Sequence, residues 1–490
     1  MLWCALHLPD LALQVFTRGS GDAAPLAILG PRPGQRVLAA NPAAIARGVA
    51  AGLRPAGALA LAPDLRLCER DLHLELAALS ELACWAGRFT PALSLDPPAT
   101  LLLELSASLR LFGGLAPLCA AIDRGVDELG FSGRLAVAPT PLAARWLAAR
   151  APGSRIDART LPAALDALPL ATLVGEAGLG EDSLELLAGI GARRLADVRR
   201  LPRNGLARRQ AQAITALLDR AYGMAPDPRP WFTPPEHYAS RLPLPAASAQ
   251  IDTLLFGVRR LLGGLGGWLD ARQVGLEAFS VVLEHESLVA ARLGISRESR
   301  LDIVLGSLSR DIGRFQLLAR EHLSRQPLPA PVDALRVEAD TPRPLAPPCE
   351  DLFETGEDEA GDPGLLLATL RARLGAGAVR CIALHADHRP ESAWRNVEPV
   401  APASRPAPAQ GASPDRPRPL WLLPAPRPIS PPKPESLLAG PERIESGWWD
   451  GAAGEVRRDY YVARRHDRSL AWVFQDCLPP HGWFVHGYFA

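Results

Sequence analysis

The chain has 490 residues, 48% of them apolar, which is enough for several packed domains of roughly 100 to 200 residues each. Its 53 basic and 53 acidic residues cancel, so total charge identifies no nucleic-acid or membrane partner, and only the distribution of charge can do so. The seven cysteines form no Cys-x-x-Cys pair, which argues against a zinc site and suits reduced thiols in a cytoplasm.

Two apolar runs carry the most informative pattern. The first opens the chain and contains His7 and Pro9, and the second runs from Ala99 and Thr100 to Gly113. The runs resemble the metal-binding strands of Y-family translesion DNA polymerases, where His7 and Pro9 would align with the first metal-binding Asp and its neighbour. Ala99 and Thr100 would align with the paired catalytic Asp-Glu. Two-metal phosphoryl transfer needs oxygen ligands for Mg²⁺, and none of these four side chains supplies a carboxylate.

The groups that hold the nucleotide in this family are also replaced. Its Ala-Asn-Tyr-x-x-Arg segment corresponds to residues 40–45, where Pro42 and Ile45 stand in place of Tyr and Arg. Neither side chain can hydrogen-bond a phosphate. The family's phosphate-binding Lys would fall near Pro152, and the chain's single lysine is Lys433. The resemblance therefore implies a polymerase-like protein without catalysis, metal ligands or a cofactor.

The order of segments predicts an α+β multidomain chain, arranged as a Y-family-like right hand with a C-terminal extension. A palm is expected over 1–160, with a finger insert at about 23–74. A helical thumb with a helix-hairpin-helix is expected over 161–228. A little-finger-like domain is expected over 229–345, where 254–269 reads as a helix and 274–283 as a strand.

The thumb segment carries the candidate DNA-binding residues. Gly178, Gly180 and Gly191 resemble the family's hairpin, in which amide N–H groups at a helix start bind a phosphate without reading bases. Arg193 and Arg194 open a run of arginines interrupted only by Asp197. The alternative is an ordinary solvated helix face. If the arginines bind primer–template DNA, affinity should fall steeply with salt.

A tether is expected over 346–363, in an acidic, proline-flanked stretch that has little capacity to bury a Leu-Phe pair. Asp351, Leu352 and Phe353 resemble a degenerate peptide that binds the β sliding clamp, with Cys349 in place of an anchoring Gln. Such peptides insert adjacent apolar anchors into a preformed pocket. A rival candidate, residues 250–256, lies on an expected buried helix.

The C-terminal part is expected to comprise a small folded segment (364–396), a Pro-rich linker (397–435) and an aromatic tail (436–490). Within the first, residues 385–388 are interpreted as a surface turn rather than a metal site. The tail, from Gly440 to the closing Trp483–Ala490, resembles the ImuB family of non-catalytic, damage-inducible mutagenesis proteins. Its aromatic and Arg side chains suit stacking on single-stranded DNA or a protein interface.

The resemblance implies a scaffold that binds DNA and the sliding clamp, a RecA-like accessory protein (ImuA) and an error-prone C-family polymerase, in damage-induced (SOS) translesion synthesis. A cytoplasmic protein, nucleoid-associated at damage and without a membrane partner, is expected, since no apolar run approaches ~20 residues. Two alternatives remain. One is an active translesion polymerase with displaced ligands among Asp10, Asp96 and Glu104. The other is a protein-binding assembly factor that does not contact DNA.

Overall fold

The structure is a computed structural model that describes residues 1–19, 24–176, 179, 181–202, 212–345, 363–375, 377–398, 418–451 and 454–489. The chain divides into two compact units, Met1–Arg373 and Leu374–Ala490. The first unit contains α-helices and sheets, and the second contains sheets with short 3₁₀ turns. The expected α+β class with a C-terminal extension is therefore confirmed. Among the described residues, no helix has the length and apolar composition needed to cross a membrane.

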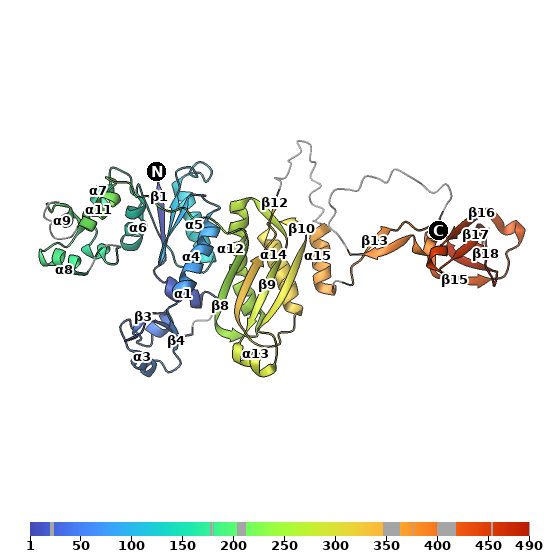
Figure 1. The fold of residues 1–490 in the computed structure, drawn as a ribbon, viewed down its shortest axis with the longest axis horizontal. Helices are drawn as coiled ribbons and strands as arrows, with labels where there is room; N and C mark the ends of the chain where they lie inside the picture. Colours follow the sequence, from blue (N-terminus) through green and yellow to red (C-terminus); the bar gives the residue numbers. More distant parts are fainter. Residues whose placement is uncertain are drawn as a thin grey trace. The chain divides into compact units, whose positions relative to one another are not determined.

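The first sheet of the first unit is antiparallel, with strand order β5-β6-β1-β7. Its central strands are apolar on both faces because both faces are covered. The face that carries Trp3 and Ala5 packs on α6 and the helices that follow it, and the face that carries Cys4 and Leu6 packs on α4 and α5 (Figure 1). The elements are β1 (Trp3–His7), α1 (Leu11–Thr17), α4 (Leu72–Ala86), β5 (Leu93–Asp96), β6 (Thr100–Glu104), α5 (Leu115–Glu128), β7 (Arg134–Ala138) and α6 (Pro141–Arg150).

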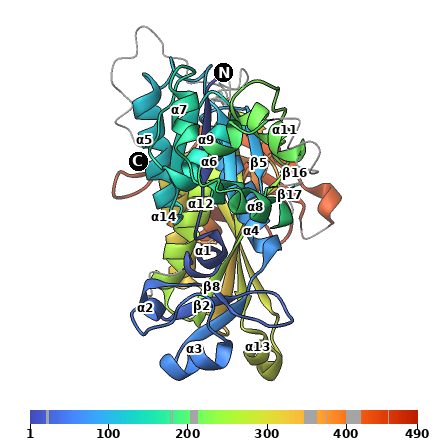
Figure 2. The same cartoon turned by 90° about the vertical axis from the view of Figure 1, so that its left-hand side faces the viewer.

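A small three-stranded sheet, of order β3-β2-β4, is inserted between α1 and α4 in the chain. It lies beside α1 and has its own apolar cluster (Figure 2). Its elements are β2 (Leu26–Leu29), β3 (Val37–Ala40), α2 (Pro42–Ile45), α3 (Pro55–Leu61) and β4 (Arg66–Glu69).

Short helices follow α6 and share its buried cluster, which extends to Leu187, Leu195 and Ile214. This packing places the helical segment against the first sheet. The helices are α7 (Leu161–Asp166), the 3₁₀ turn η1 (Leu170–Leu173), α8 (Glu181–Gly189), α9 (Leu195–Arg199) and α11 (Gln212–Ala221).

The second large sheet has the order β10-β9-β11-β8, with β12 paired to β9. α12 and α14 cover one face around a core that includes Trp268 and Phe315. The predicted helix 254–269 and strand 274–283 are confirmed as parts of α12 and β9. The elements are β8 (Tyr238–Ser248), α12 (Ile251–Arg272), β9 (Val274–His285), α13 (Ser287–Leu293), β10 (Glu298–Ser309), α14 (Ile312–Arg325), β11 (Val332–Ala339), β12 (Arg343–Pro344) and α15 (Pro363–Leu374).

The second unit contains a two-stranded hairpin and a five-stranded sheet of order β15-β19-β18-β17-β16. Most aromatic side chains of the tail lie on this sheet, where Tyr460 stacks on Trp472 with ring centroids 4.0 Å apart, whereas Trp448 and Trp449 are exposed in the turn η5. The elements are β13 (Cys381–Leu384), η3 (Pro390–Ser392), β14 (Trp394–Val397), β15 (Trp421–Ile429), η4 (Pro434–Ser436), β16 (Leu437–Ser446), η5 (Trp448–Asp450), β17 (Val456–Arg464), β18 (Leu470–Asp476) and β19 (Gly482–Tyr488).

The linker expected over 397–435 is corrected in part, because residues 421–429 form strand β15. Pro424, Pro426 and Pro428 alternate along it, and the pairing with β19 shifts register between Leu422 and Arg427, where two of these prolines lie. β15 ends the sheet and pairs only with β19. An edge strand tolerates prolines on its unpaired side, which is why a proline-rich sequence can be a strand here.

Candidate functional site

The positions that would carry metal ligands meet at one end of the first sheet. β1 and β6 are antiparallel, and His7 lies directly opposite Thr100. His7 Nδ1 is 3.1 Å from Thr100 Oγ1, and the Leu8 amide donates to the Ala99 carbonyl at 2.8 Å. Pro9 follows in the exposed turn before α1. The four positions are thus neighbours in space, and they contain a neutral His–Thr pair with no carboxylate.

Four side chains form a row across this end of the sheet. The strand register pairs Asp96 with Thr100, Thr100 with His7, and His7 with Arg134. Residues directly opposite each other on adjacent strands point to the same face, so the row lies on the face that α6 covers. Asp96 is the one acid in the row.

The Asp96 carboxylate is bound by two arginines. Arg229 lies 2.9 Å from one carboxylate oxygen and Arg145 3.1 Å from the other. Each arginine has a second acidic partner, Asp227 for Arg229 and Glu176 for Arg145. The Asp96 side chain is only 14% exposed. Its negative charge is therefore neutralised inside an ion-pair network and is not available to hold a divalent cation.

The electrostatic surroundings of His7 are positive. Burial lowers the pKa of His7, and the charges of Arg134, Arg145 and Arg150 lower it further, while Asp10 opposes them. A lowered pKa keeps the imidazole neutral at pH 7 because its ordinary value is near 6.5. Three guanidinium groups around a neutral His–Thr pair disfavour the binding of Mg²⁺ at this end of the sheet.

The other two alternative ligands are not placed to join Asp96. Glu104 lies opposite Trp3, four residues along β6 from Thr100, or about 13 Å at ~3.3 Å per residue. Its carboxylate accepts hydrogen bonds from the Leu2 and Ser106 amides at 3.1 and 3.2 Å. Asp10 is exposed beyond the end of β1. Across the described ranges, no group of three or more His, Cys, Asp or Glu side chains is arranged to hold a metal.

The segment that would hold the nucleotide is used for local structure. Asn41 caps α2 by accepting from the Ala44 amide at 3.0 Å, and its side chain also bonds the Leu26 amide. Pro42 occupies the first turn of α2 and Ile45 is exposed. Asn41 therefore stabilises the small sheet, and the segment presents no phosphate-binding side chain at positions 42 and 45.

The structure describes Leu179 and residues 181–202 of the helical hairpin. Gly178 and Gly180 therefore lie outside the described residues. Gly191 has φ +90° with open space around it, a conformation that favours glycine. Arg193 and Arg194 are exposed, and their amides donate to the Asp197 carboxylate at 2.9 and 3.0 Å. These two hydrogen bonds lower the pKa of Asp197.

The hairpin amides expected to face a phosphate are already used within the chain. Besides those bonded to Asp197, the amides of Gly191 and Ala192 donate to the carbonyls of Ala188 and Leu187. The groups left to contact an anion are the exposed guanidinium groups. Arg199 is less available because it pairs with Asp166 at 2.5 Å and lies over Tyr222. Arg203, Arg208 and Arg209 fall outside the described residues.

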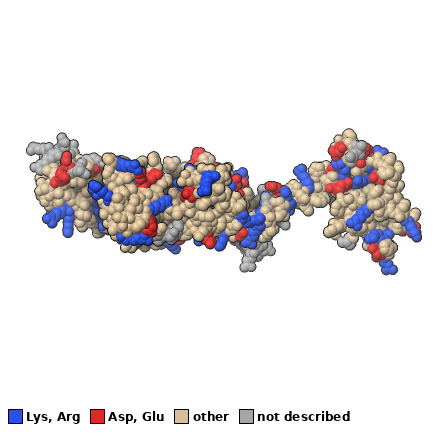
Figure 3. Space-filling model, turned by 90° about the horizontal axis from the view of Figure 1, so that it is seen from below, with Lys and Arg blue, Asp and Glu red and all other residues tan. Residues whose placement is uncertain are grey.

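The face of the second sheet opposite α12 and α14 carries charges of both signs in contact. Arg241 pairs with Glu284 at 2.7 Å, Arg336 with Glu298 at 3.0 Å, and Arg300 with a further acid, Glu338. On the side of the molecule drawn in Figure 3, basic and acidic side chains are likewise interspersed. This sheet face is a network of ion pairs and does not carry a predominantly positive or negative charge.

Asp351, Leu352 and Phe353 lie outside the described residues, as does most of the expected tether. The rival segment at 250–256 is part of α12, where Leu254 is fully buried and Phe256 lies under the Arg260 guanidinium at 4.3 Å. The apolar side chains of this rival segment therefore pack within the protein and are not free to bind a clamp.

The Asp96–Arg145–Arg229 network is the feature that sequence reasoning missed. The sequence indicates Asp96 only as a displaced metal ligand and suggests no role for Arg145 or Arg229. These residues are 49 and 84 positions apart in turn, and no local spacing indicates that they meet. Only the packing of α6 and of the segment after α11 against β5 brings them together.

Comparison with known proteins places this geometry in a context. A sequence model described as the impB/mucB/samB family matches residues 22–149. "Protein ImuB" of two strains of Caulobacter vibrioides is 29% identical over 476 residues, covering 90% of this chain and all of the relative. Among solved structures, the chimera Dbh-Dpo4(243-245)-Dbh, a Y-family DNA polymerase, aligns at TM-score 0.39, and DinB from Sulfolobus solfataricus at 0.38. Each is 16% identical and covers 69% of this chain and 98% of the neighbour.

Proposed function

Because the chain is an ImuB-like, Y-family polymerase-like protein, we propose that it is a non-catalytic scaffold in damage-induced translesion synthesis. It binds primer–template DNA and the sliding clamp and recruits an error-prone polymerase that performs the synthesis. In this proposal residues 1–160 act as the palm with its finger insert, 161–228 as the thumb and 229–345 as the little finger.

The His7–Thr100 pair carries the proposal. It occupies the meeting point of two strands where a catalytic relative would hold its cations, and it offers two neutral side chains 3.1 Å apart. The nearest acid in the row, Asp96, is held by Arg145 and Arg229. Since two-metal catalysis requires carboxylate ligands at the reacting phosphate, this arrangement supports binding without nucleotide transfer.

Primer extension tests the absence of catalysis. The full chain, supplied with Mg²⁺ or Mn²⁺, is expected to add no nucleotide to undamaged or lesion-bearing templates on which an active Y-family polymerase adds them. The variant His7→Asp with Thr100→Glu is expected to remain inactive, because Ala99 still supplies no carboxylate and Arg145 and Arg229 still neutralise Asp96. Incorporation by the unmodified chain that survives repurification would overturn the proposal.

DNA binding is assigned to the helical hairpin through the Arg193 and Arg194 side chains, which are exposed while their amides are occupied. The variant Arg193→Ala with Arg194→Ala is expected to weaken binding of primer–template DNA. It should also reduce the slope of log K against log[salt] by about 2, since each phosphate contact contributes roughly 0.9. Fluorescence anisotropy at several salt concentrations measures both quantities.

The matched control removes two exposed arginines elsewhere, Arg32→Ala with Arg292→Ala, and should leave the salt slope nearly unchanged. If both double variants change the slope equally, binding follows total charge and the hairpin is not the contact. If DNA does not bind at all, the assembly-factor alternative is favoured.

The partners follow from the same proposal. Asp351, Leu352 and Phe353 are assigned to the β sliding clamp, and the aromatic tail to the protein partners, a RecA-like accessory protein of the ImuA type and a C-family polymerase. These assignments are supported by the resemblance of the tail and by the burial of the rival segment in α12. The protein is expected in the cytoplasm and on damaged nucleoid DNA.

A further inference from the structure

Arg134 and His7 form an adjacent pair with an unusual charge balance. They face each other across β7 and β1, so their Cβ atoms are about 5 Å apart on one face of the sheet. Arg134 is exposed and has no hydrogen-bond or ion-pair partner among the described residues. A guanidinium without a carboxylate partner retains five N–H donors and a full positive charge for a ligand.

His7 can present a donor on the same side. Its Nδ1 is engaged with the Thr100 hydroxyl at 3.1 Å, and its Nε2 has no partner within the part of the chain that the structure describes. When the Thr100 hydroxyl donates to Nδ1, the neutral ring carries its proton on Nε2. His7 then offers an N–H group next to the Arg134 fork.

The charges around the pair favour an anion. Arg145 and Arg150 lie near His7 on α6, and Asp10 is the one acid that acts against them there. The Asp96 carboxylate farther along the row is neutralised by Arg145 and Arg229. A catalytic relative needs negative side chains here to bind cations. In this chain the same end of the sheet carries neutral His7 and Thr100 and the positive side chain of Arg134.

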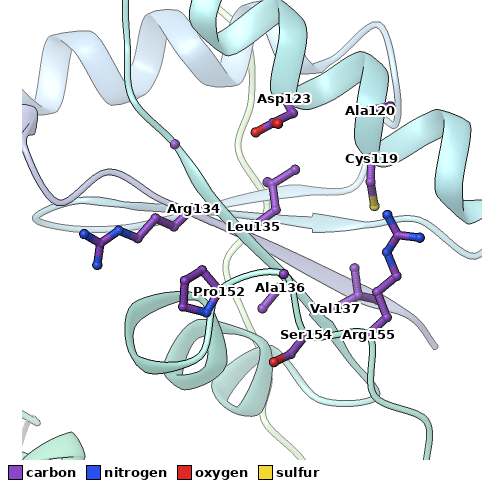
Figure 4. Close-up of a pocket in the computed structure, with 12 residues that line it drawn as sticks. Cys119, Ala120, Asp123, Arg134, Leu135, Ala136, Val137, Pro152, Ser154 and Arg155 are labelled. Carbon is purple, nitrogen blue, oxygen red and sulfur yellow. The ribbon is translucent and has the colours of Figure 1, made fainter.

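A hollow of about 380 Å³ adjoins the pair at the edge of the sheet. It lies between β7, α5 and residues 152–155, and Arg134 lines it whereas His7 does not. Figure 4 shows the Arg134 side chain extending outward from the other lining residues with Pro152 close to it, Asp123 on the α5 side, and the Arg155 guanidinium near Cys119. Pro152 stands near the position of the family's phosphate-binding Lys, so Arg134 supplies a cation beside the place where one was lost.

We propose that Arg134 and His7 form a phosphate-binding site at the end of the first sheet, where a catalytic relative would bind metal ions. The ligand is a phosphate group, and the same chemistry could come from a nucleic-acid backbone or from a free phosphate or nucleotide. The inference deepens the proposed function, since a bound phosphate at this position would hold DNA on the palm without any reaction.

Histidine-selective NMR of the full chain tests the site directly. The protein is labelled with ¹³C at its ten histidines, and the His7 ring signal is identified by its loss in His7→Gln. Pyrophosphate and primer–template DNA are titrated separately at low ionic strength, where such contacts are least screened. A shift of the His7 signal by DNA identifies backbone phosphate as a ligand, and a shift by pyrophosphate identifies free phosphate; either supports the site.

Arg134→Gln is expected to weaken the interaction that shifts His7 by about tenfold, because the charge-assisted hydrogen bonds are lost. Arg292→Gln, an exposed arginine on α13, should leave it unchanged. No shift of His7 with either ligand, or the same affinity in Arg134→Gln, would overturn the site. DNA binding that still depends on Arg193 and Arg194 would then leave the proposed function intact. Conversely, a His7 response to pyrophosphate in a protein that does not bind DNA would support the phosphate site and contradict the proposed DNA binding.

Discussion

Replacing Glu81 by alanine is expected to lower the free energy of unfolding of the first unit by about 3–5 kcal/mol, the cost of leaving a buried charge unpaired. Arg18 and Glu81 form an ion pair at 2.6 Å, with side chains only 3% and 5% exposed. The Ser240 hydroxyl also donates to Glu81 at 2.7 Å. The substitution removes the carboxylate that accepts from Arg18 and Ser240, and it leaves the Arg18 guanidinium buried without this partner.

The effect should reach beyond one helix because the pair lies where two sheets join. Glu81 is on α4, which packs on the first sheet, and Ser240 is on β8 of the second. Nearby, α12 packs closely on α4, so that a Cβ added at Gly267 would lie 2.6 Å from Trp85 Cα. Loss of Glu81 should therefore loosen the second sheet from the first.

Urea denaturation of the full chain, followed by far-UV circular dichroism, measures the change. The control is Glu69→Ala, which removes the partner of Arg32 in a pair whose side chains are 77% and 60% exposed. It should have a much smaller effect, because exposed ion pairs contribute little to stability. The apolar double variant Arg18→Met with Glu81→Leu should recover much of the loss, because no charge is then left buried. Equal effects of Glu69→Ala and Glu81→Ala would contradict the expectation.

Acidification from pH 6.5 to about 4 is expected to destabilise the second unit through His486. This side chain is fully buried, and its Nδ1 lies 2.8 Å from the Tyr460 hydroxyl. Burial lowers the pKa of His486 to about 4; Glu391, 3.8 Å from Nε2, opposes the shift and Arg458 adds to it. The folded state therefore keeps the ring neutral where the unfolded chain protonates it.

The sign follows from proton binding. Between pH 6.5 and about 4 the unfolded chain binds a proton at His486 and the folded chain does not, so falling pH favours unfolding. The stability that the neutral, buried His486 ring gives the folded state is fully present above the unfolded pKa of about 6.5. It is lost as the pH falls towards the folded pKa of about 4. The shift corresponds to roughly 3 kcal/mol at 1.36 kcal/mol per pKa unit.

Urea midpoints of the full chain between pH 7 and 4.5, read by tryptophan fluorescence, check this expectation. His486→Phe should flatten the pH dependence, whereas His466→Gln, which alters an exposed histidine, should preserve it. Asp387 does not confuse the result, because Arg389 holds the pKa of Asp387 at about 2, well below this window. Wild-type stability that does not change between pH 6.5 and 4.5 would contradict the role of His486.

Periodic elements were predictable from the sequence where local pattern and packing agree. The helix expected at 254–269 and the strand expected at 274–283 are found within α12 and β9. β15 was not predictable, because three alternating prolines indicate a linker unless the strand happens to lie at a sheet edge. Edge position is a property of the assembled sheet, and no local signal in residues 421–429 reveals it.

In the helical hairpin, too, some features were predictable from the sequence and others depend on the folded structure. Gly191 was expected in the turn of the hairpin, and its φ of +90° is a conformation that favours glycine. The sequence also placed Asp197 four residues after Arg193 but did not indicate that its carboxylate would take the two amides expected to bind phosphate. That assignment depends on the local geometry of the turn before α9.

The sequence by itself determined which chemical groups stand at the adjoining ends of β1 and β6. His7, Pro9, Ala99 and Thr100 contain no carboxylate, and no fold can supply one from these side chains. Only the tertiary structure decided the fate of the remaining charges. It placed Asp96 between Arg145 and Arg229, and within the described ranges it left Arg134 beside His7 without an acidic partner. The reason is that composition limits the possible ligands, whereas ion pairing joins residues that only long-range packing brings within a few ångströms.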